Sequence, residues 1–197
     1  MKTKLVTYFT QLMPLTEEEK QAVLESAEVR TFAKGTTLLQ EGQIAQEGYF
    51  VLQGVIRQYQ VIEGEEKTTN FFTEDQWVLS LTSMLQQVPA DHYLACEEDV
   101  TVITGDETKE KVLFEKYPKL ETLSRALLER ELGEQQARMS RYITQTAEQR
   151  YLELMHTRPN LVHRVPQYQL ASYIGVKPES LSRIRKRMTQ NRQPNSK

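Results

Sequence analysis

The chain has 197 residues, enough to bury a hydrophobic core as one large or two small domains. Its 39% hydrophobic residues, 26% charged residues and formal net charge of −2 are ordinary for a soluble globular protein, and no apolar run approaches the roughly 18 residues of a membrane span. The N-terminus lacks the sustained apolar region of a signal peptide, and the single cysteine, Cys96, excludes an intramolecular disulfide, so we expect a cytoplasmic protein.

The first third of the chain begins with a helix and changes to strands near residue 30. Thr16 and Glu19 have the spacing of a capping box, in which each side chain satisfies a free backbone N–H at a helix start. Short apolar segments then alternate with glycines, and Glu63–Glu66 has the composition of a hairpin turn. We expect strands at 36–40, 49–52, 55–62, 67–72, 92–96 and 100–104, arranged as an antiparallel jelly roll.

Helical patterning returns at about Thr108 and continues to about His156, with Pro118 where a first helical turn tolerates it. Two apolar seams run along this segment. The first is expected to pack on the chain itself, and the second, with alternating spacings of four and three, favours a partner helix. The seams are Leu120, Leu123 and Leu127, and Leu128, Leu132, Gln135, Met139 and Tyr142. The pattern predicts a dimerisation helix over 111–143; a helix packed only on its own chain is the alternative.

Two short helices are expected near the C-terminus, after a short extended piece at 161–165. Pro166 suits the first turn of the first helix, whose buried face is Leu170, Ala171 and Ile174. Gly175 follows, where a glycine adopts the left-handed conformation at no cost, and Pro178 is suited to begin the second helix. Two short helices joined by a tight glycine turn are typical of a helix-turn-helix, although an ordinary amphipathic helix pair has the same pattern.

The second helix, predicted over 178–189, lies in a basic segment. Residues 177–197 carry a formal charge of +6, so the other 176 residues carry −8. Because Leu181, Ile184 and Met188 must pack inward, the opposite face is free to meet a polyanion. Arginine can bind guanine, glutamate can accept from cytosine, and flanking basic side chains can meet phosphates. The predicted DNA contacts are Gln167, Gln169, Lys177, Glu179, Ser180, Ser182, Arg183, Arg185, Lys186 and Arg187.

This order of parts resembles the Crp/Fnr family of bacterial transcription regulators, which have a cyclic-nucleotide-binding-type jelly roll, a long dimer helix and a C-terminal helix-turn-helix. The resemblance covers almost the whole chain, and its most specific pieces are GYFVLQGVIR at 48–57 and QLASYIGVKPESLSRI at 169–184. It implies base contacts by Glu179 and Arg183, and it puts Pro178, which cannot serve, at another base-contacting position. The length and final helix look most like the short branch common in Bacteroidetes-type bacteria, and 189–197 is too short and polar for a full wing.

The same resemblance raises a question about the effector. The segments by which the family's cyclic-nucleotide sensors hold the cyclic phosphate correspond to Val78–Leu81 and Ala90–Tyr93. No Lys or Arg occurs between Thr68 and Thr108, whereas eight acids do. A buried phosphate without a cationic or hydrogen-bonding partner is strongly unfavourable. We therefore expect no binding of cAMP in the usual way; another small molecule, or no effector, are the alternatives.

Other candidate sites are weaker. His92, His156, His163 and Cys96 lie in different expected elements without metal-ligand spacing, and the acidic run at 97–99 is expected to be a solvated turn. No nucleophile motif surrounds Ser80, Ser83 or Cys96. We expect neither an enzyme nor a metal or other cofactor.

Together these patterns predict an α+β protein with a jelly-roll sensor domain at 1–110, the dimerisation helix at 111–143 and a helix-turn-helix DNA-binding domain at 144–197. The expected function is that of a homodimeric, sequence-specific transcription regulator on a palindromic DNA site, with RNA polymerase and a small-molecule effector as candidate partners. The alternative is a small-molecule sensor that acts through protein contacts and has a vestigial DNA-binding end. The effector, the target sequence, activation or repression, and DNA contact by 189–197 are left open.

Overall fold

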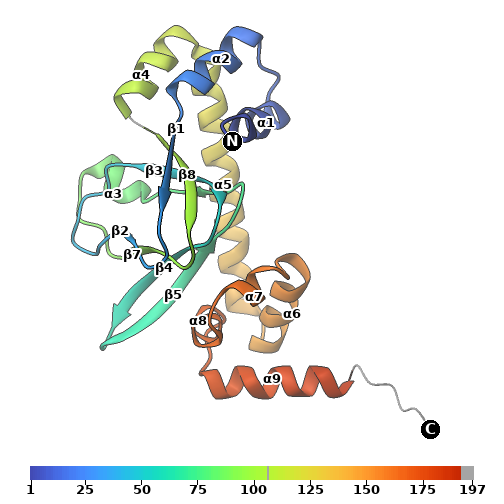
Figure 1. The fold of residues 1–197 in the computed structure, drawn as a ribbon. Coiled ribbons are helices and arrows are strands. Elements are labelled where there is room, and N and C mark those ends of the chain that lie inside the picture. The colour runs from blue at the N-terminus through green and yellow to red at the C-terminus, as the bar shows by residue number, and fades with distance from the viewer. Residues whose placement is uncertain (106, 192–197) are drawn as a thin grey trace.

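A computed structural model describes residues 1–105 and 107–191 (Figure 1). It begins with two helices, α1 (Thr3–Leu12) and α2 (Glu17–Ser26). The predicted capping box is confirmed, because the Glu19 N–H donates to the Thr16 hydroxyl (3.2 Å) and the Thr16 N–H donates to the Glu19 carboxylate (2.7 Å). Helix α1 was not predicted; its buried Leu5 and the aromatic side chains Tyr8 and Phe9 pack with α2 and the neighbouring sheet.

Two four-stranded antiparallel sheets form the body of the molecule, as the jelly-roll prediction requires. The first has the order β1 (Glu28–Phe32), β8 (Val100–Gly105), β3 (Gly48–Gln53) and β6 (Trp77–Val78). The second has the order β2 (Thr37–Leu39), β7 (Tyr93–Cys96), β4 (Ile56–Ile62) and β5 (Glu65–Phe72). The predicted hairpin turn joins β4 and β5, where Glu63 and Gly64 have φ of 54° and 80°.

Strand β3 is buried on both faces, and this determines how the layers stack. Val51 faces the second sheet and is buried in one cluster with Ile56 and Leu94 of that sheet. Phe50 and Leu52 point to the opposite side, because successive side chains of a strand alternate between faces. There they meet α1, α2 and the buried seam of the long helix, so helices cover the outer face of the first sheet.

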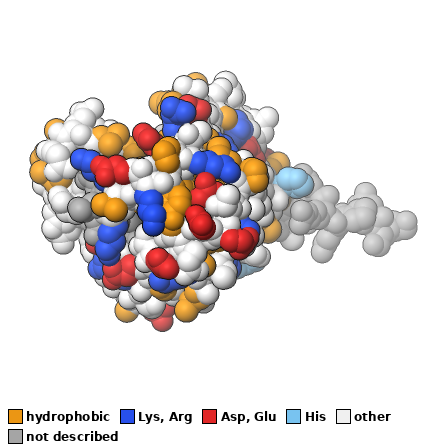
Figure 2. Space-filling model, turned by 90° about the horizontal axis from the view of Figure 1, so that it is seen from above, with side chains coloured by type: hydrophobic (Ala, Val, Ile, Leu, Met, Phe, Trp, Pro, Cys, Tyr) orange, Lys and Arg blue, Asp and Glu red, His pale blue; other side chains and the backbone are white. Residues whose placement is uncertain are grey.

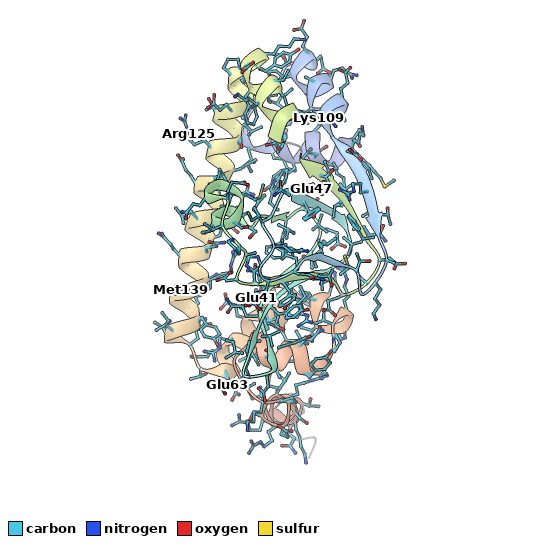
Figure 3. All side chains as sticks on the ribbon, turned by 90° about the vertical axis from the view of Figure 1, so that its left-hand side faces the viewer. Glu41, Glu47, Glu63, Lys109, Arg125 and Met139 are labelled. Carbon is cyan, nitrogen blue, oxygen red and sulfur yellow. The ribbon has the colours of Figure 1, made fainter. Side chains whose placement is uncertain are left out.

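The helical segment expected from about residue 108 is divided in the structure. A first helix, α4 (Glu107–Lys116), ends before Tyr117, and the long helix α5 (Pro118–Thr144) begins at Pro118. Figure 3 shows α5 running along one side of the molecule, with Arg125 and Met139 on it. The helix α3 (Leu81–Gln86) was not predicted; it follows β6 and ends at Gln87 with φ of 53°. None of the helices in the described residues is long and apolar enough to cross a membrane.

Four helices form the C-terminal part: α6 (Ala147–Thr157), α7 (Leu161–Arg164), α8 (Gln167–Tyr173) and α9 (Pro178–Asn191). A second capping box, between Thr146 and Gln149, starts α6 immediately after the end of α5. The extended piece predicted at 161–165 is wrong: residues 161–164 are helical, because Leu161 and Val162 are both buried together in the C-terminal core, which an alternating strand does not allow. Only Val165 is extended.

The two ends of the molecule differ in surface character. Seen from the end that carries α1, α2 and α4, basic and acidic side chains are interspersed (Figure 2). Helix α9 lies at the opposite end and crosses the direction of α5 (Figure 1). Its described cationic side chains are all exposed.

Candidate nucleic-acid interface

The turn between α8 and α9 depends on a glycine. Gly175 has φ of 74°, and the turn closes through the Val176 N–H donating to the Ala171 carbonyl (2.9 Å). A Cβ on Gly175 would also collide with the hydroxyl group of Tyr142 from α5. The backbone conformation therefore favours glycine, and the Tyr142 side chain would have to move to admit any other residue.

Arg150 of α6 holds this turn against the end of α5. Its Nε donates to the Ile174 carbonyl (2.9 Å), and its Nη1 donates to the carbonyls of Tyr142 (2.9 Å) and Gln145 (2.6 Å). The guanidinium also lies over the Tyr142 ring, with Cζ 4.5 Å from the ring centroid. This one partly buried arginine thus fixes the turn of the helix pair relative to the long helix.

The apolar faces of the helix pair point inward as predicted. Leu170, Ala171 and Ile174 of the first helix and Leu181 and Ile184 of the second are all buried. They form one cluster with Tyr151 and Leu154 of α6, and Met188 packs against that cluster. Because α9 is oriented by this side, its opposite face lies at the surface.

That opposite face carries most of the predicted DNA contacts. Glu179, Arg183 and Lys186 are exposed, and Arg183 donates to the Ser180 hydroxyl (3.2 Å). A groove of about 510 Å³ lies between α9 and the start of α6. Its lining includes the predicted residues Ser180, Arg183, Lys186 and Arg187, together with Ala147, Val176, Ile184 and Gln190. Lys177 and Ser182 are exposed as well.

Two flanking arginines have partners within the chain. Arg185 donates to the Gln167 side chain, which places that residue of α8 beside α9. Arg187 forms an ion pair with Glu148 of α6 (3.0 Å). These contacts are exposed, so both arginines can exchange them for a phosphate at small cost.

Gln169 lies elsewhere. It is only 3% exposed, and its amide donates to both carboxylate oxygens of Glu97 (2.9 and 3.0 Å). Arg57, also buried, donates to the same carboxylate (2.5 Å). Gln169 therefore belongs to a contact between the helix pair and the sheets rather than to the exposed face.

This contact between the C-terminal helices and the sheets has an apolar centre. Val55, just before β4, and Phe71 of β5 are fully buried in the same cluster as the C-terminal helices. Phe71 meets Tyr173 of α8 edge-on, with ring centroids 5.4 Å apart, and its carbonyl accepts from Arg158 (2.9 Å). The Thr68 N–H of β5 donates to the Ser172 hydroxyl (2.9 Å), so β5 is held to α8 through a backbone group as well as through side chains.

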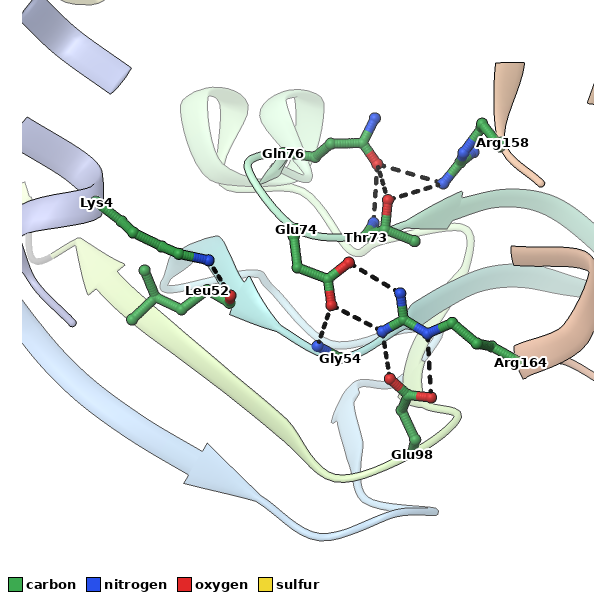
Figure 4. A network of polar contacts seen from close by, with 9 residues as sticks. All are labelled: Lys4, Leu52, Gly54, Thr73, Glu74, Gln76, Glu98, Arg158 and Arg164. Carbon is green, nitrogen blue, oxygen red and sulfur yellow. Dashed lines mark hydrogen bonds and ion pairs between the residues drawn. The ribbon is translucent and has the colours of Figure 1, made fainter. Parts of the chain in front are cut away.

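Arg164 joins the two parts through two carboxylates (Figure 4). It donates to both oxygens of Glu74 (2.9 and 2.8 Å) and to Glu98. Burial pushes the pKa of Glu74 up, but hydrogen bonds from Arg164 and from the Gly54 N–H outweigh it and lower the pKa to about 2. Glu74 is therefore ionised throughout the neutral range and holds Arg164 as a charged pair.

The acidic run at 97–99 was expected to be a solvated turn, and this expectation is wrong for Glu97 and Glu98. Both are partly buried because cationic and amide groups from the C-terminal helices reach them. The burial of these two glutamates could have been inferred from the absence of Lys and Arg at 69–107. Eight acids lie in that segment, so any cation that pairs with them must come from elsewhere in the chain. The partners themselves, Arg164 and Gln169, are remote in sequence.

The segments that correspond to a cyclic-phosphate site hold other contacts. Ser83, buried beside them in α3, accepts from the Ala45 N–H (2.9 Å) and donates to the Val88 carbonyl (2.6 Å). His92 is buried and lies 2.9 Å from the Asp91 carboxylate. Among the described residues, no group of three or more His, Cys, Asp and Glu is arranged to hold a metal ion.

Comparisons with known proteins agree with this architecture. Residues 29–117 match the family described as the cyclic nucleotide-binding domain. No curated protein matches the chain. Solved structures share its fold across both parts. The c-di-GMP-responsive global regulator CLP of Xanthomonas campestris has a TM-score of 0.69 at 15% identity, and the match covers 92% of this chain and 96% of that one. FixK2 of Bradyrhizobium japonicum has a TM-score of 0.66 at 18% identity, covering 87% and 89%.

The catabolite activator protein of Thermus thermophilus is a third structure with this fold, with a TM-score of 0.56 at 18% identity, covering 93% of this chain and 87% of that one. The predicted fold class is confirmed by these likenesses. The structures that carry it are regulators of the Crp/Fnr type, which supports the resemblance drawn from the sequence at the level of the fold.

Proposed function

We propose that the protein is a homodimeric, sequence-specific DNA-binding regulator of transcription that inserts α9 into the major groove. The observation that carries this proposal is the exposed face of α9. This helix follows a turn that Arg150 holds against α5, packs through a buried apolar side, and presents Glu179, Arg183 and Lys186 to solvent. Among the described residues, neither Glu179 nor Lys186 forms an ion pair or side-chain hydrogen bond.

The residues of this face have different roles in the proposal. Glu179 and Arg183 lie one turn apart and contact base edges, because carboxylate and guanidinium groups pair with cytosine and guanine in the major groove. Phosphates are met by the flanking polar and basic groups, which position the helix without reading sequence. This second set is Gln167, Lys177, Ser180, Ser182, Arg185, Lys186 and Arg187. Gln169 is left out because its amide is engaged by Glu97.

A second copy of the chain is the proposed partner of α5. The seam Leu120, Leu123 and Leu127 is buried on the chain's own sheet. The other seam is exposed: Leu132 by 57%, Met139 by 68% and Tyr142 by 50%. Apolar side chains at alternating spacings of three and four on one exposed stripe are the arrangement that a coiled-coil dimer buries. Two copies of α9 would then lie in successive major grooves, about 34 Å apart.

The dimer is tested by placing a charge in the exposed seam. Leu132→Glu and Met139→Glu are each expected to shift the molecular mass measured by light scattering from dimer to monomer, because two like charges would face each other across the interface. Leu152, an exposed leucine of α6, supplies the matched control: Leu152→Glu should stay dimeric. A monomeric wild type, or dimeric seam variants, would contradict the proposal.

The effector of this regulator is proposed not to be cAMP held in the usual way. Ser80, Ser83 and His92 are buried at or beside the segments in question, and no Lys or Arg belongs to either segment. Isothermal titration of the full chain with cAMP should show no saturable binding. Saturable binding that is lost on mutating these segments would overturn this part of the proposal alone. We further propose a cytoplasmic location and no catalytic activity.

Selection of bound sequences from random double-stranded DNA is the decisive experiment. We expect an enriched palindrome, and the affinity for it should fall steeply with salt because phosphate contacts release counterions. Equal affinity for the selected site and for random DNA would refute the proposal. Failure to enrich any sequence would instead favour the alternative, a small-molecule sensor that acts through protein contacts.

A further inference from the structure

A cavity of about 670 Å³ opens between the two sheets at the edge strands β1 and β2. Its walls are largely apolar, with Leu39, Tyr49 and Leu94 buried and Phe32 packed against them. The loop that contains Ile44 and Ala45 closes one side. Its lining includes none of the residues at 78–81 or 90–93, so it is separate from the segments considered above. Cavities of this size commonly hold small molecules.

A charged residue stands at an inward position of this cavity. Arg30 pairs in register with Val102, which pairs with Val51, and both valines face the second sheet. Because Arg30 lies in the same row, it shares that face. The guanidinium lies over the Phe32 ring, with Cζ 5.0 Å from the centroid, and lines the cavity.

Arg30 uses only one of its nitrogens. Nη1 donates to both oxygens of Glu47 (2.9 and 2.7 Å), while Nε and Nη2 make no hydrogen bond to any described residue. Burial and the neighbouring Glu47 carboxylate raise the pKa of Tyr49 to about 12, so its phenol stays protonated beside that carboxylate. Glu47 is thus paired with Arg30 through Nη1, and the edge of the planar, five-donor guanidinium formed by Nε and Nη2 is left free.

Two other arginines of the chain show that one guanidinium can bind two carboxylates. Arg57 binds two carboxylates, those of Glu66 (2.7 Å) and Glu97 (2.5 Å). Arg164 also binds two, those of Glu74 and Glu98. Arg30 has one carboxylate and an apolar cavity beside it.

We infer that this cavity binds a small apolar monocarboxylic acid, whose carboxylate pairs with the free edge of Arg30 and whose apolar body lies on Phe32, Leu39 and Leu94. A guanidinium pairs with a carboxylate through two parallel hydrogen bonds, which Nε and Nη2 can supply. A phosphate monoester fits less well, because its second negative charge would face Glu47 without another cation in the lining. An inward arginine on an edge strand can also serve to prevent edge-to-edge pairing, which requires no ligand.

The test is isothermal titration of the full-length protein at constant ionic strength with octanoate and with 3-phenylpropanoate, each beside its uncharged amide. We expect saturable binding of at least one acid and of neither amide. Arg30→Gln should weaken the binding at least about tenfold, since a charge-assisted hydrogen-bonded pair is lost. Ile44→Trp, on the exposed loop, should weaken it by filling the cavity while leaving the charge in place.

Arg125→Gln, an equal change of charge on the exposed surface of α5, is the matched control and should bind the acid as the wild type does. No binding of either acid would overturn the inference and leave the edge-protection role of Arg30. Equal binding of acid and amide, or unchanged binding by Arg30→Gln, would overturn it as well. The inference does not depend on DNA binding, so its failure and that of the proposed regulator are separate outcomes.

Discussion

The two sides of the C-terminal helix pair use the same residue types in opposite ways. On the side that meets the sheets, arginine, glutamine and serine are paired: Arg164 of α7 with two carboxylates, and Gln169 and Ser172 of α8 with the Glu97 carboxylate and the Thr68 backbone. On the outer side of α9, neither Arg183 nor Lys186 forms an ion pair with an acid among the described residues. A cation's role therefore follows from the carboxylates within reach. A cation with carboxylates of the sheets within reach joins the C-terminal helices to the sheets. A cation without them is free to bind a polyanion.

Of the substitutions that test this comparison, Phe71→Ala is expected to change the free energy of unfolding most. Phe71 is fully buried at the centre of the contact between the sheets and the C-terminal helices. Replacing a buried phenylalanine by alanine lowers the free energy of unfolding by about 3–5 kcal/mol. The free energy of unfolding in urea should fall by that amount. Tyr168→Ala on the exposed side of α8 is the control, with little change expected. Equal effects of the two changes would show that the docked arrangement does not exist in solution.

A pair of arginine substitutions tests the two sides directly. Arg164→Ala leaves Glu74 and Glu98 without their cation and should lower the free energy of unfolding by roughly 1.5–3 kcal/mol. Arg185→Ala, whose arginine is exposed and bonded only to Gln167, should change it by less than about 0.5 kcal/mol. On the proposed function, Arg185→Ala weakens DNA binding at all sequences. The comparison fails if Arg185→Ala destabilises the protein as much as Arg164→Ala does.

Arg183→Ala should separate base recognition from stability. If Arg183 contacts a base, the loss on the selected site is about 1–3 kcal/mol in binding free energy, with relaxed preference at one position, measured by fluorescence anisotropy on a set of single-base variants. The free energy of unfolding should be unchanged, because the side chain is exposed. A uniform loss across all sequences would make Arg183 a phosphate contact instead.

The smallest effect concerns pH. The pKa of Glu74 lies near 2 in the folded protein, below its ordinary value of 4.5, so its stabilising contribution is complete above about pH 4.5 and is lost as the pH falls through about 2. The difference in unfolding free energy between wild type and Glu74→Gln should be constant at neutral pH and shrink below 4.5. A difference that grew on acidification would contradict the ionised pair with Arg164.

Much of the fold was predictable because its determinants are local. All strands between 36 and 104 except β6 follow from periodicity and turn chemistry over a few residues, as do the capping box at Thr16, the glycine turn at Gly175 and the two seams of α5. The short helix α7 was missed because burial of its adjacent residues by distant helices, and not local propensity, selected its conformation. The division of the long helical segment at Tyr117 was also missed, although Pro118 marked it.

For the candidate interface, too, some features follow from the local sequence and others do not. The inward and outward faces of α9 follow from 3.6-residue periodicity, so the sequence by itself determined which side chains are exposed there. The burial of Gln169, the two carboxylates of Arg164 and the free edge of Arg30 were decided by the tertiary structure alone. Each joins residues separated by 17 to 90 positions, and no local pattern specifies which acid a given arginine will meet once the sheets and helices pack together.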